Sequence, residues 1–383
     1  MMLRTVPTVQ VSMIVAVAVV GSATAAVAQD RKWEVEVHGG GTVATSPTGG
    51  TAALLAAGTL FSLPPPPGGL PPGAPALPTS RRESSWYFGD GAVLVNQVNT
   101  AQVSIGLGVT GKITPLDPVM NSSVARRQTG GSIGFRISRH ITPRYTAEFN
   151  FDYSRGRLEM GSAGLAGIEA SRASFISAFN ALVVAGLPKT VTSTATIHSS
   201  EGRQIFTTGV LNINLKTDGK IVPYATVGGG VVVNSGNTPS ATLTGTYRIV
   251  SSPLSPFPGV LLFNETDTVN LRYSIEHRAF VGVLGGGIKY AVSPRWGVRL
   301  DVRAHLSKNS VSNLVDANPT VATLTPAESL SALGVNPTIF VSNNPSRPVQ
   351  SSLSGPAISG FRTFAGNGMQ TQISIVPGFF WRF

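Results

Sequence analysis

The sequence lacks cysteine altogether, and only 12% of its 383 residues are charged. An exported protein without cysteine has no disulfides, so another device must hold the chain together. After Asp30 the sequence also lacks any run apolar and long enough for a membrane-spanning helix. If the mature chain lies in a membrane, it must therefore do so as a closed β-barrel.

Basic residues exceed acidic ones, and the formal net charge is +11. The sequence has no dense run of lysine and arginine and no nucleic-acid-binding motif, so we expect no nucleic acid partner. We expect the positive charges to be spread over a barrel interior and its loops. The 43 glycines and 27 prolines are consistent with a protein made of strands, turns and long connections.

The first 28 residues have the pattern of a secretory signal peptide. Arg4 is the only charged residue before Asp30, residues 9–20 are mostly apolar, and 26–28 read Ala-Val-Ala, a small-x-small cleavage site. The apolar run ends before it reaches the roughly 20 residues that a membrane anchor needs. The sequence therefore predicts a signal peptide, residues 1–28, and an exported chain, residues 29–383.

The last stretch of the sequence, residues 368–383, alternates with a period of two from Gln372 onward. One face holds Ile373, Ile375, Pro377, Phe379, Trp381 and Phe383. This period predicts a strand, and an exposed apolar strand is an aggregation hazard in water. The pattern favours a strand whose apolar face meets lipid and whose edges are paired. The alternative is a core strand of a soluble sandwich.

Seven further strands are predicted upstream, at residues 32–41, 131–139, 145–155, 203–216, 221–234, 271–291 and 296–306. Short turns alternate with long connections near residues 42–130, 156–202, 235–270 and 307–367. We therefore predict an all-β fold: an eight-stranded antiparallel up-and-down transmembrane barrel with four long external loops. The first loop contains a proline-rich segment, residues 63–78, and the second a short amphipathic helix, residues 167–184.

Two segments carry a family resemblance. Residues 222–230 (Val-Pro-Tyr-Ala-Thr-Val-Gly-Gly-Gly) resemble the start of the fifth strand of the OmpA-type small outer-membrane barrel domains, and residues 285–303 resemble their sixth strand, turn and seventh strand. With the terminal Phe383, the resemblance covers the last third of the chain. It implies an eight-stranded outer-membrane barrel, and we expect no peptidoglycan-binding domain after it. The loops are longer than is usual in that family, and Pro377 predicts a local irregularity in the last strand.

Charged residues of both signs are predicted to face the barrel interior. They are Glu34, Glu36, Arg136, Glu148, Asp152, Arg299, Asp301 and Arg303. An eight-stranded barrel is just wide enough for side chains to fill it, and buried charges are tolerated when they pair. The pattern favours a salt-bridged plug, and a narrow gated pore is the alternative.

Catalytic chemistry has one candidate, the pair His305 and Ser307. The spacing resembles the His-x-Ser pair of outer-membrane lipid A deacylases, but both residues fall on the face predicted to line the interior, and no acidic residue follows nearby. The other histidines have no metal-ligand spacing. We therefore predict no enzyme activity, no catalytic residues, no cofactor and no metal.

The sequence thus predicts an outer-membrane protein of a Gram-negative-type bacterium with a structural or surface-interaction role. A narrow, porin-like small-solute channel is the alternative, and a lipid-modifying enzyme is a third reading. The expected partners are outer-membrane lipids, an unidentified extracellular ligand, and the barrel-assembly machinery. The resemblance implies that this machinery reads Phe379, Trp381 and Phe383 as an assembly signal.

Overall fold

A computed structural model describes residues 32–45, 49–55, 59–62, 68–69, 71–73, 79–89, 91–93, 111–181, 189–250, 261–321, 339–341, 349–353 and 357–383. The predicted signal peptide and most of the proline-rich segment lie outside these ranges and remain predictions. No helix in the described part of the chain is long and apolar enough to cross a membrane.

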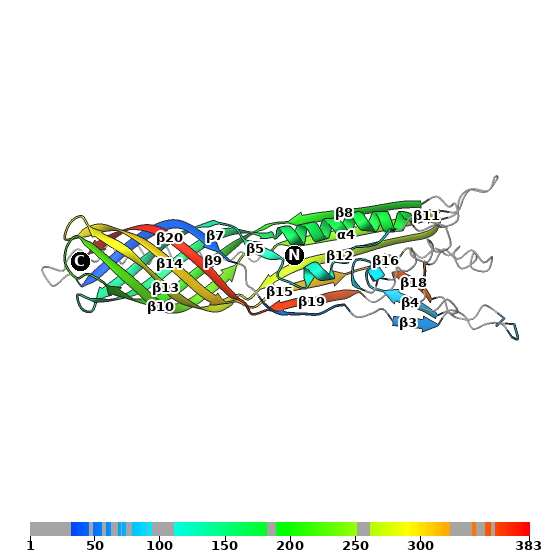
Figure 1. Ribbon diagram of the computed structural model, residues 1–383, viewed down its shortest axis with the longest axis horizontal. Coiled ribbons are helices and arrows are strands. Elements are labelled where there is room, and N and C mark those ends of the chain that lie inside the picture. The colour runs from blue at the N-terminus through cyan, green and yellow to red at the C-terminus, as the bar shows by residue number, and fades with distance from the viewer. Residues whose placement is uncertain are drawn as a thin grey trace, which may run out of the picture.

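Eight antiparallel strands close into a barrel at one end of an elongated molecule (Figure 1). In order around the barrel they are β6 (Gly130–His140), β1 (Trp33–Ala44), β20 (Met369–Arg382), β14 (Trp296–Lys308), β13 (Arg278–Ala291), β10 (Ile221–Ser235), β9 (Ser200–Asn214) and β7 (Tyr145–Met160). Strand β7 pairs with both β6 and β9, which closes the circle. Each predicted strand overlaps one of these eight, so the predicted barrel is confirmed.

One end of the barrel carries the short turns, and we call it the turn end. The turns are residues 141–144, 215–220 and 292–295. The first and last strands also meet there, since the backbone N–H of Phe383 donates to the carbonyl of Trp33 over 3.0 Å. The pairing of β20 with β14 stays in register past Pro377. On the other side of β20, Gly39 and Gly40, which lie opposite Pro377 and Val376, do not pair with that strand. The irregularity predicted at this proline is therefore local.

Six of the eight barrel strands continue past the other end of the barrel after a short break. Their continuations form a second sheet in the order β2 (Thr51–Ala52), β19 (Ile358–Gly366), β15 (Val311–Ala317), β12 (Leu261–Ile275), β11 (Ser240–Val250) and β8 (Lys189–His198). Strand β16 (Thr320–Val321) pairs with β12. We call this sheet, with the elements packed on it, the extension.

Two helices and two further groups of strands complete the described structure. Helix α4 (Ser162–Ala181) follows β7 and packs on β8 and β11, while α3 (Asp117–Met120) lies beside α4. Strand β5 (Ala125–Arg127) pairs with the end of β7. A small sheet contains β3 (Thr59–Ser62), β4 (Thr79–Glu83), β18 (Val349–Leu353) and β17 (Ile339–Val341).

The structure corrects the prediction that the chain between the barrel strands forms long loops. Residues 235–270 contain β11 and much of β12, residues 156–202 contain α4 and β8, and residues 307–367 contain β15 and β19. Residues 42–130 contain β2, β3, β4, α3 and β5. Strand β11 shows why these strands were predicted as loops: its buried residues Ala241, Leu243 and Tyr247 alternate with threonines that face outward. These threonines lower the mean hydropathy, yet the period of two persists.

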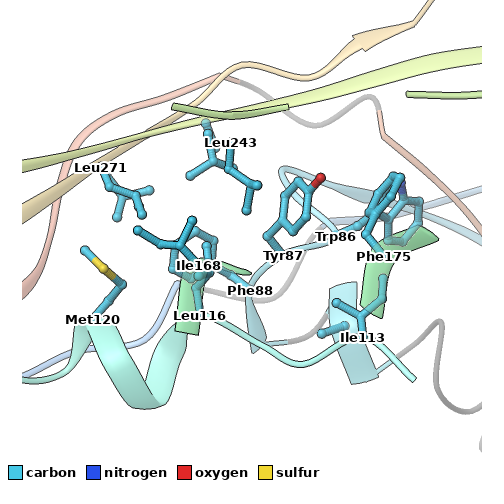
Figure 2. Close-up of a cluster of buried hydrophobic side chains, with 14 of the residues drawn as sticks. Trp86, Tyr87, Phe88, Ile113, Leu116, Met120, Ile168, Phe175, Leu243 and Leu271 are labelled. Carbon is cyan, nitrogen blue, oxygen red and sulfur yellow. The ribbon is translucent and has the colours of Figure 1, made fainter. Parts of the chain in front are cut away.

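The extension has an apolar core of its own (Figure 2). Trp86, Tyr87 and Phe88 enter it from the chain before α3, and α4 contributes Ile168 and Phe175. Trp86 and Tyr87 are fully buried. The rings of Tyr87 and Phe175 stack with centroids 5.1 Å apart. A helix is therefore confirmed where one was predicted at residues 167–184, but it begins at Ser162 and ends at Ala181, and its buried side chains pack within the extension.

The barrel has an apolar outside and a polar inside. Along β7 the side chains of Thr146, Glu148 and Asn150 are buried, whereas Tyr145 and Phe149 are exposed. Exposed apolar residues occur on seven of the eight barrel strands, among them Val37, Ile133, Phe149, Val227, Leu284, Leu300 and Ile375, and the outward Ile205 on β9 is half-buried. In the extension the arrangement is reversed, with apolar side chains inside and threonines outside.

Candidate functional site: the charged barrel interior

The eight charged residues predicted to face the interior are all at most 7% exposed. They come from four strands: β1, β6, β7 and β14. Arg303 on β14 reaches Glu148 on β7, and these two strands are not neighbours in the sheet. Such pairs cross the interior, so the structure places the eight side chains inside the barrel.

A central ring holds three carboxylates and three guanidinium groups: Glu36, Glu148, Asp301, Arg136, Arg299 and Arg303. Arg299 lies at its centre. Its Nη1 is 2.9 Å from Glu36 and 2.7 Å from Glu148, and its Nη2 is 3.1 Å from Asp301. The ring therefore balances three negative charges with three positive ones.

The other two arginines complete the central ring. Arg303 Nη2 is 2.5 Å from Glu148 Oε1 and 2.9 Å from Asp301 Oδ2. Arg136 Nη1 is 2.8 Å from Glu36 Oε1 and 2.7 Å from Asp301 Oδ2. Each carboxylate thus contacts two or more guanidinium groups, which is the condition under which buried charges are tolerated.

A second layer of charge lies nearer the turn end. Lys289 Nζ is 2.5 Å from Glu34, and Arg382 Nε is 3.0 Å from the same carboxylate. Lys289 is 3% exposed and was not among the predicted interior residues. The signal for it was present, because it lies between the outward-facing residues Ile288 and Tyr290 on β13.

Asp152 lies on the side of the central ring toward the extension and contacts the imidazole of His38. Gly134 makes room for this pair, because a Cβ there would lie 2.6 Å from Asp152 Oδ1 and 2.7 Å from His38 Nε2. Gly378 makes room for Glu36 in the same way, because a Cβ at position 378 would lie 2.4 Å from Glu36 Oε1. The alternation rule cannot reveal such glycines, because their role depends on the residue facing them.

The candidate catalytic pair does not form an acyl-transfer site. His305 and Ser307 are both about 5% exposed inside the barrel, as expected from their strand face. The His305 ring packs on Phe206 with centroids 4.8 Å apart, and neither ring nitrogen has a hydrogen-bond partner. A nucleophile needs a base within hydrogen-bond reach that is itself oriented by a third group. His305 and Ser307 lack that geometry.

The three aromatic residues of the predicted assembly signal lie on the outside of β20. Phe379, Trp381 and Phe383 are 49%, 44% and 38% exposed. Phe379 packs against Trp296 on the neighbouring strand, with ring centroids 5.6 Å apart. Trp33 is also exposed at this end. Four outward aromatic residues, Trp33, Phe379, Trp381 and Phe383, therefore lie at the turn end of the barrel.

The residues that the structure describes contain no cluster of three or more histidine and acidic side chains suited to a metal ion. No protein-family model matches the sequence, and no curated protein matches it.

Several solved structures align with the chain. Acinetobacter baumannii CarO is 10% identical, with 68% of this chain and 94% of that one covered and a TM-score of 0.21. The Pseudomonas putida toluene transporter TodX is 10% identical, with coverage of 93% and 90% and a TM-score of 0.19. The CymD monoaromatic hydrocarbon channel is 9% identical, with coverage of 93% and 89% and a TM-score of 0.19. These identities and TM-scores are too low to indicate a shared function.

Proposed function

We propose that the protein is an integral outer-membrane barrel that holds the extension outside the cell, in a structural or surface-interaction role. The observation that carries this proposal is the reversal of polarity between barrel and extension. Outward residues on β13, such as Phe280 and Leu284, are apolar and exposed, whereas outward residues on β12, such as Thr266 and Thr268, are polar. An apolar outer wall is stable in lipid, and a polar one is stable in water.

The orientation follows from the two ends of the barrel. Bacterial outer-membrane barrels have short turns on the periplasmic side and longer segments outside the cell. The turn end would then face the periplasm, where its aromatic residues meet the lipid headgroups. Strand β20 would present Phe379, Trp381 and Phe383 to the barrel-assembly machinery, as the resemblance to OmpA-type domains implies. Outer-membrane lipids would cover the apolar wall.

The charged interior supports a closed barrel in preference to a channel. The central ring is neutral, its members are buried, and they bind one another across the barrel. An ion that passed this ring would have to break several charge-assisted hydrogen bonds between buried groups. We therefore propose that the barrel anchors the extension without conducting, and we assign it no enzymatic activity.

Conductance across a planar bilayer tests this proposal. The refolded protein should insert and show no discrete, stable conductance steps. The double variant Glu148→Ala/Arg303→Ala removes one charge of each sign from the central ring, so it keeps the net charge while it opens space. It should conduct and so show that the assay detects an opened barrel. Stable conductance by the unmodified protein would favour the narrow channel instead.

A further inference from the structure

A cavity of about 420 Å³ lies where the barrel meets the extension. Three strand breaks coincide there: residue 199 between β8 and β9, residues 236–239 between β10 and β11, and residues 276–277 between β12 and β13. We call it the junction cavity, and its lining includes Arg127, Arg203, Gln204, Asn234, Arg272 and His277. In Figure 1 the junction between the barrel and the extension lies where β5, β7 and β9 approach β12 and β15.

The junction cavity is lined by basic and neutral residues. Three arginines and one histidine face it, and none of its lining residues is acidic. Arg203 and Arg272 are exposed on the outer side of the wall, while Gln204 and Asn234 are buried on the inner side. The cavity therefore joins the outer surface to the interior at the mouth of the barrel.

Arg127 is the unusual member of this lining. It is 7% exposed, and its Nη2 donates only to neutral oxygens, among them the carbonyls of Ser154 at 3.3 Å and Gly202 at 3.2 Å. Its Nε has no hydrogen-bond partner, and no carboxylate of the described residues forms an ion pair with it. Burial lowers the pKa of this guanidinium to about 10.

The fold does not explain this unpaired charge. A buried cation without a counter-ion is costly, and the charges of the central ring all have partners. Two acidic groups on the strands beside it are engaged elsewhere, since Glu201 binds Arg155 and Glu159 lies 3.0 Å from Arg157. An anion in the junction cavity would satisfy Arg127 and would also attract the two exposed arginines.

We propose that the junction cavity binds an oxyanion group, a phosphate or a carboxylate, with Arg127 as the principal contact and Arg203 and Arg272 at the entrance. A guanidinium is suited to such groups because its N–H donors match the geometry of their oxygens. The group has two possible sources: a small free anion, or the phosphate of a lipid headgroup at the outer membrane surface. The buried apolar side chains of Phe206, Val232, Ala279 and Val281 form a cluster inside the barrel near this cavity.

Inorganic phosphate is the first probe, titrated by calorimetry into the full-length protein in phosphatidylcholine nanodiscs. We expect saturable binding that weakens as salt is added. Arg127→Gln should weaken it at least about tenfold, the loss expected for a charge-assisted contact of about 1.4 kcal/mol or more. Arg272→Gln should weaken it about threefold, because that arginine is exposed and already pairs with Asp316. Arg248→Gln should have no effect, because this exposed arginine lies on β11 away from the cavity.

The second arm repeats the titration in nanodiscs that also contain lipid A. If a lipid phosphate occupies the site, free phosphate binding should fall and the lipid A phosphorus resonance should shift in the unmodified protein but not in Arg127→Gln. If the site takes small anions only, free phosphate binding should be unchanged. Heat-modifiable migration on a detergent gel confirms that each variant has folded. The proposal is overturned if neither probe binds, or if Arg127→Gln and Arg272→Gln bind as the unmodified protein does.

Discussion

Glu148 is the residue on which the central ring depends most. Its carboxylate contacts Arg299 and Arg303 and also accepts from Asn212 over 2.7 Å. Glu148→Gln would leave two buried guanidinium groups short of a counter-ion, so we expect a loss of about 3–5 kcal/mol in the free energy of unfolding. Urea unfolding of the refolded protein measures it.

The matched control is Glu201→Gln, which removes an exposed partner of Arg155 at the end of the barrel that meets the extension. That pair is surrounded by solvent, so we expect little change in stability. Equal losses for the buried and the exposed substitution would contradict the account of the ring as a tightly paired, buried network.

Phe383 separates two roles, membrane anchor and assembly signal. Deleting Phe383 should sharply reduce the amount of barrel in the membranes of cells, while the yield of refolding into detergent stays close to normal, because one rim side chain contributes only about 2–3 kcal/mol. Comparing the two yields for the same deletion measures the difference. If neither yield changes, the terminal aromatic residue is an ordinary part of the strand.

At the scale of residues, alternation was enough to place the eight predicted charges inside the barrel. It did not identify their partners, since a pair such as Arg303 and Glu148 joins strands far apart in the sequence. Arg127 could not be singled out either. It lies in a three-residue strand, β5, which is too short to show a period.

Two buried carboxylates on β12 connect the elements of the extension. Asp267 accepts from the backbone N–H of Trp86 over 2.6 Å and from the Ser85 hydroxyl over 3.0 Å. Glu265 accepts from the Tyr247 hydroxyl and from the backbone N–H of Leu353. Burial raises the pKa of Glu265 to about 8 and that of Asp267 to about 7. Both carboxyl groups therefore favour the protonated form in the folded state.

These raised pKa values make the stability of the extension depend on pH. The unfolded carboxyl groups titrate near pH 4, so between about pH 4 and pH 8 the folded state binds more protons than the unfolded state. Stability should therefore fall as pH rises through this window. We expect the extension to unfold at a lower temperature at pH 9 than at pH 5, followed by the fluorescence of Trp86 with the other three tryptophans replaced by phenylalanine.

The double variant Glu265→Gln/Asp267→Asn is the control for this pH dependence. It keeps the size of both side chains and removes their titration, so its unfolding temperature should change much less between the two pH values. A pH dependence as steep as that of the unmodified chain would show that other groups are responsible.

At the scale of elements, the eight barrel strands could be predicted because lipid requires an almost continuous apolar face. The strands of the extension were missed because their outward face is rich in threonine, as at Thr242, Thr244 and Thr246 on β11. A hydropathy average treats such a strand as a loop. Helix α4 was found because a few large apolar residues, Ile168, Phe175 and Phe179, recur at roughly helical spacing.

The whole molecule is one set of long strands that passes through two surroundings. Six of the eight barrel strands have continuations in the extension, and the polarity of the two faces reverses between them. The sequence could predict the barrel from its own pattern. It could not predict the extension, because that sheet is held by contacts between distant segments, such as Trp86 with Phe179.

The reversal of polarity is the central claim, and the absence of cysteine makes it directly measurable with nitroxide spin labels. One label replaces Leu284, an outward residue of β13, and the other replaces Thr268, an outward residue of β12. In reconstituted liposomes the label at 284 should be more accessible to oxygen than to a water-soluble nickel complex, and the label at 268 should show the reverse. Preferential access of the nickel complex to the label at 284 would contradict a membrane-spanning barrel.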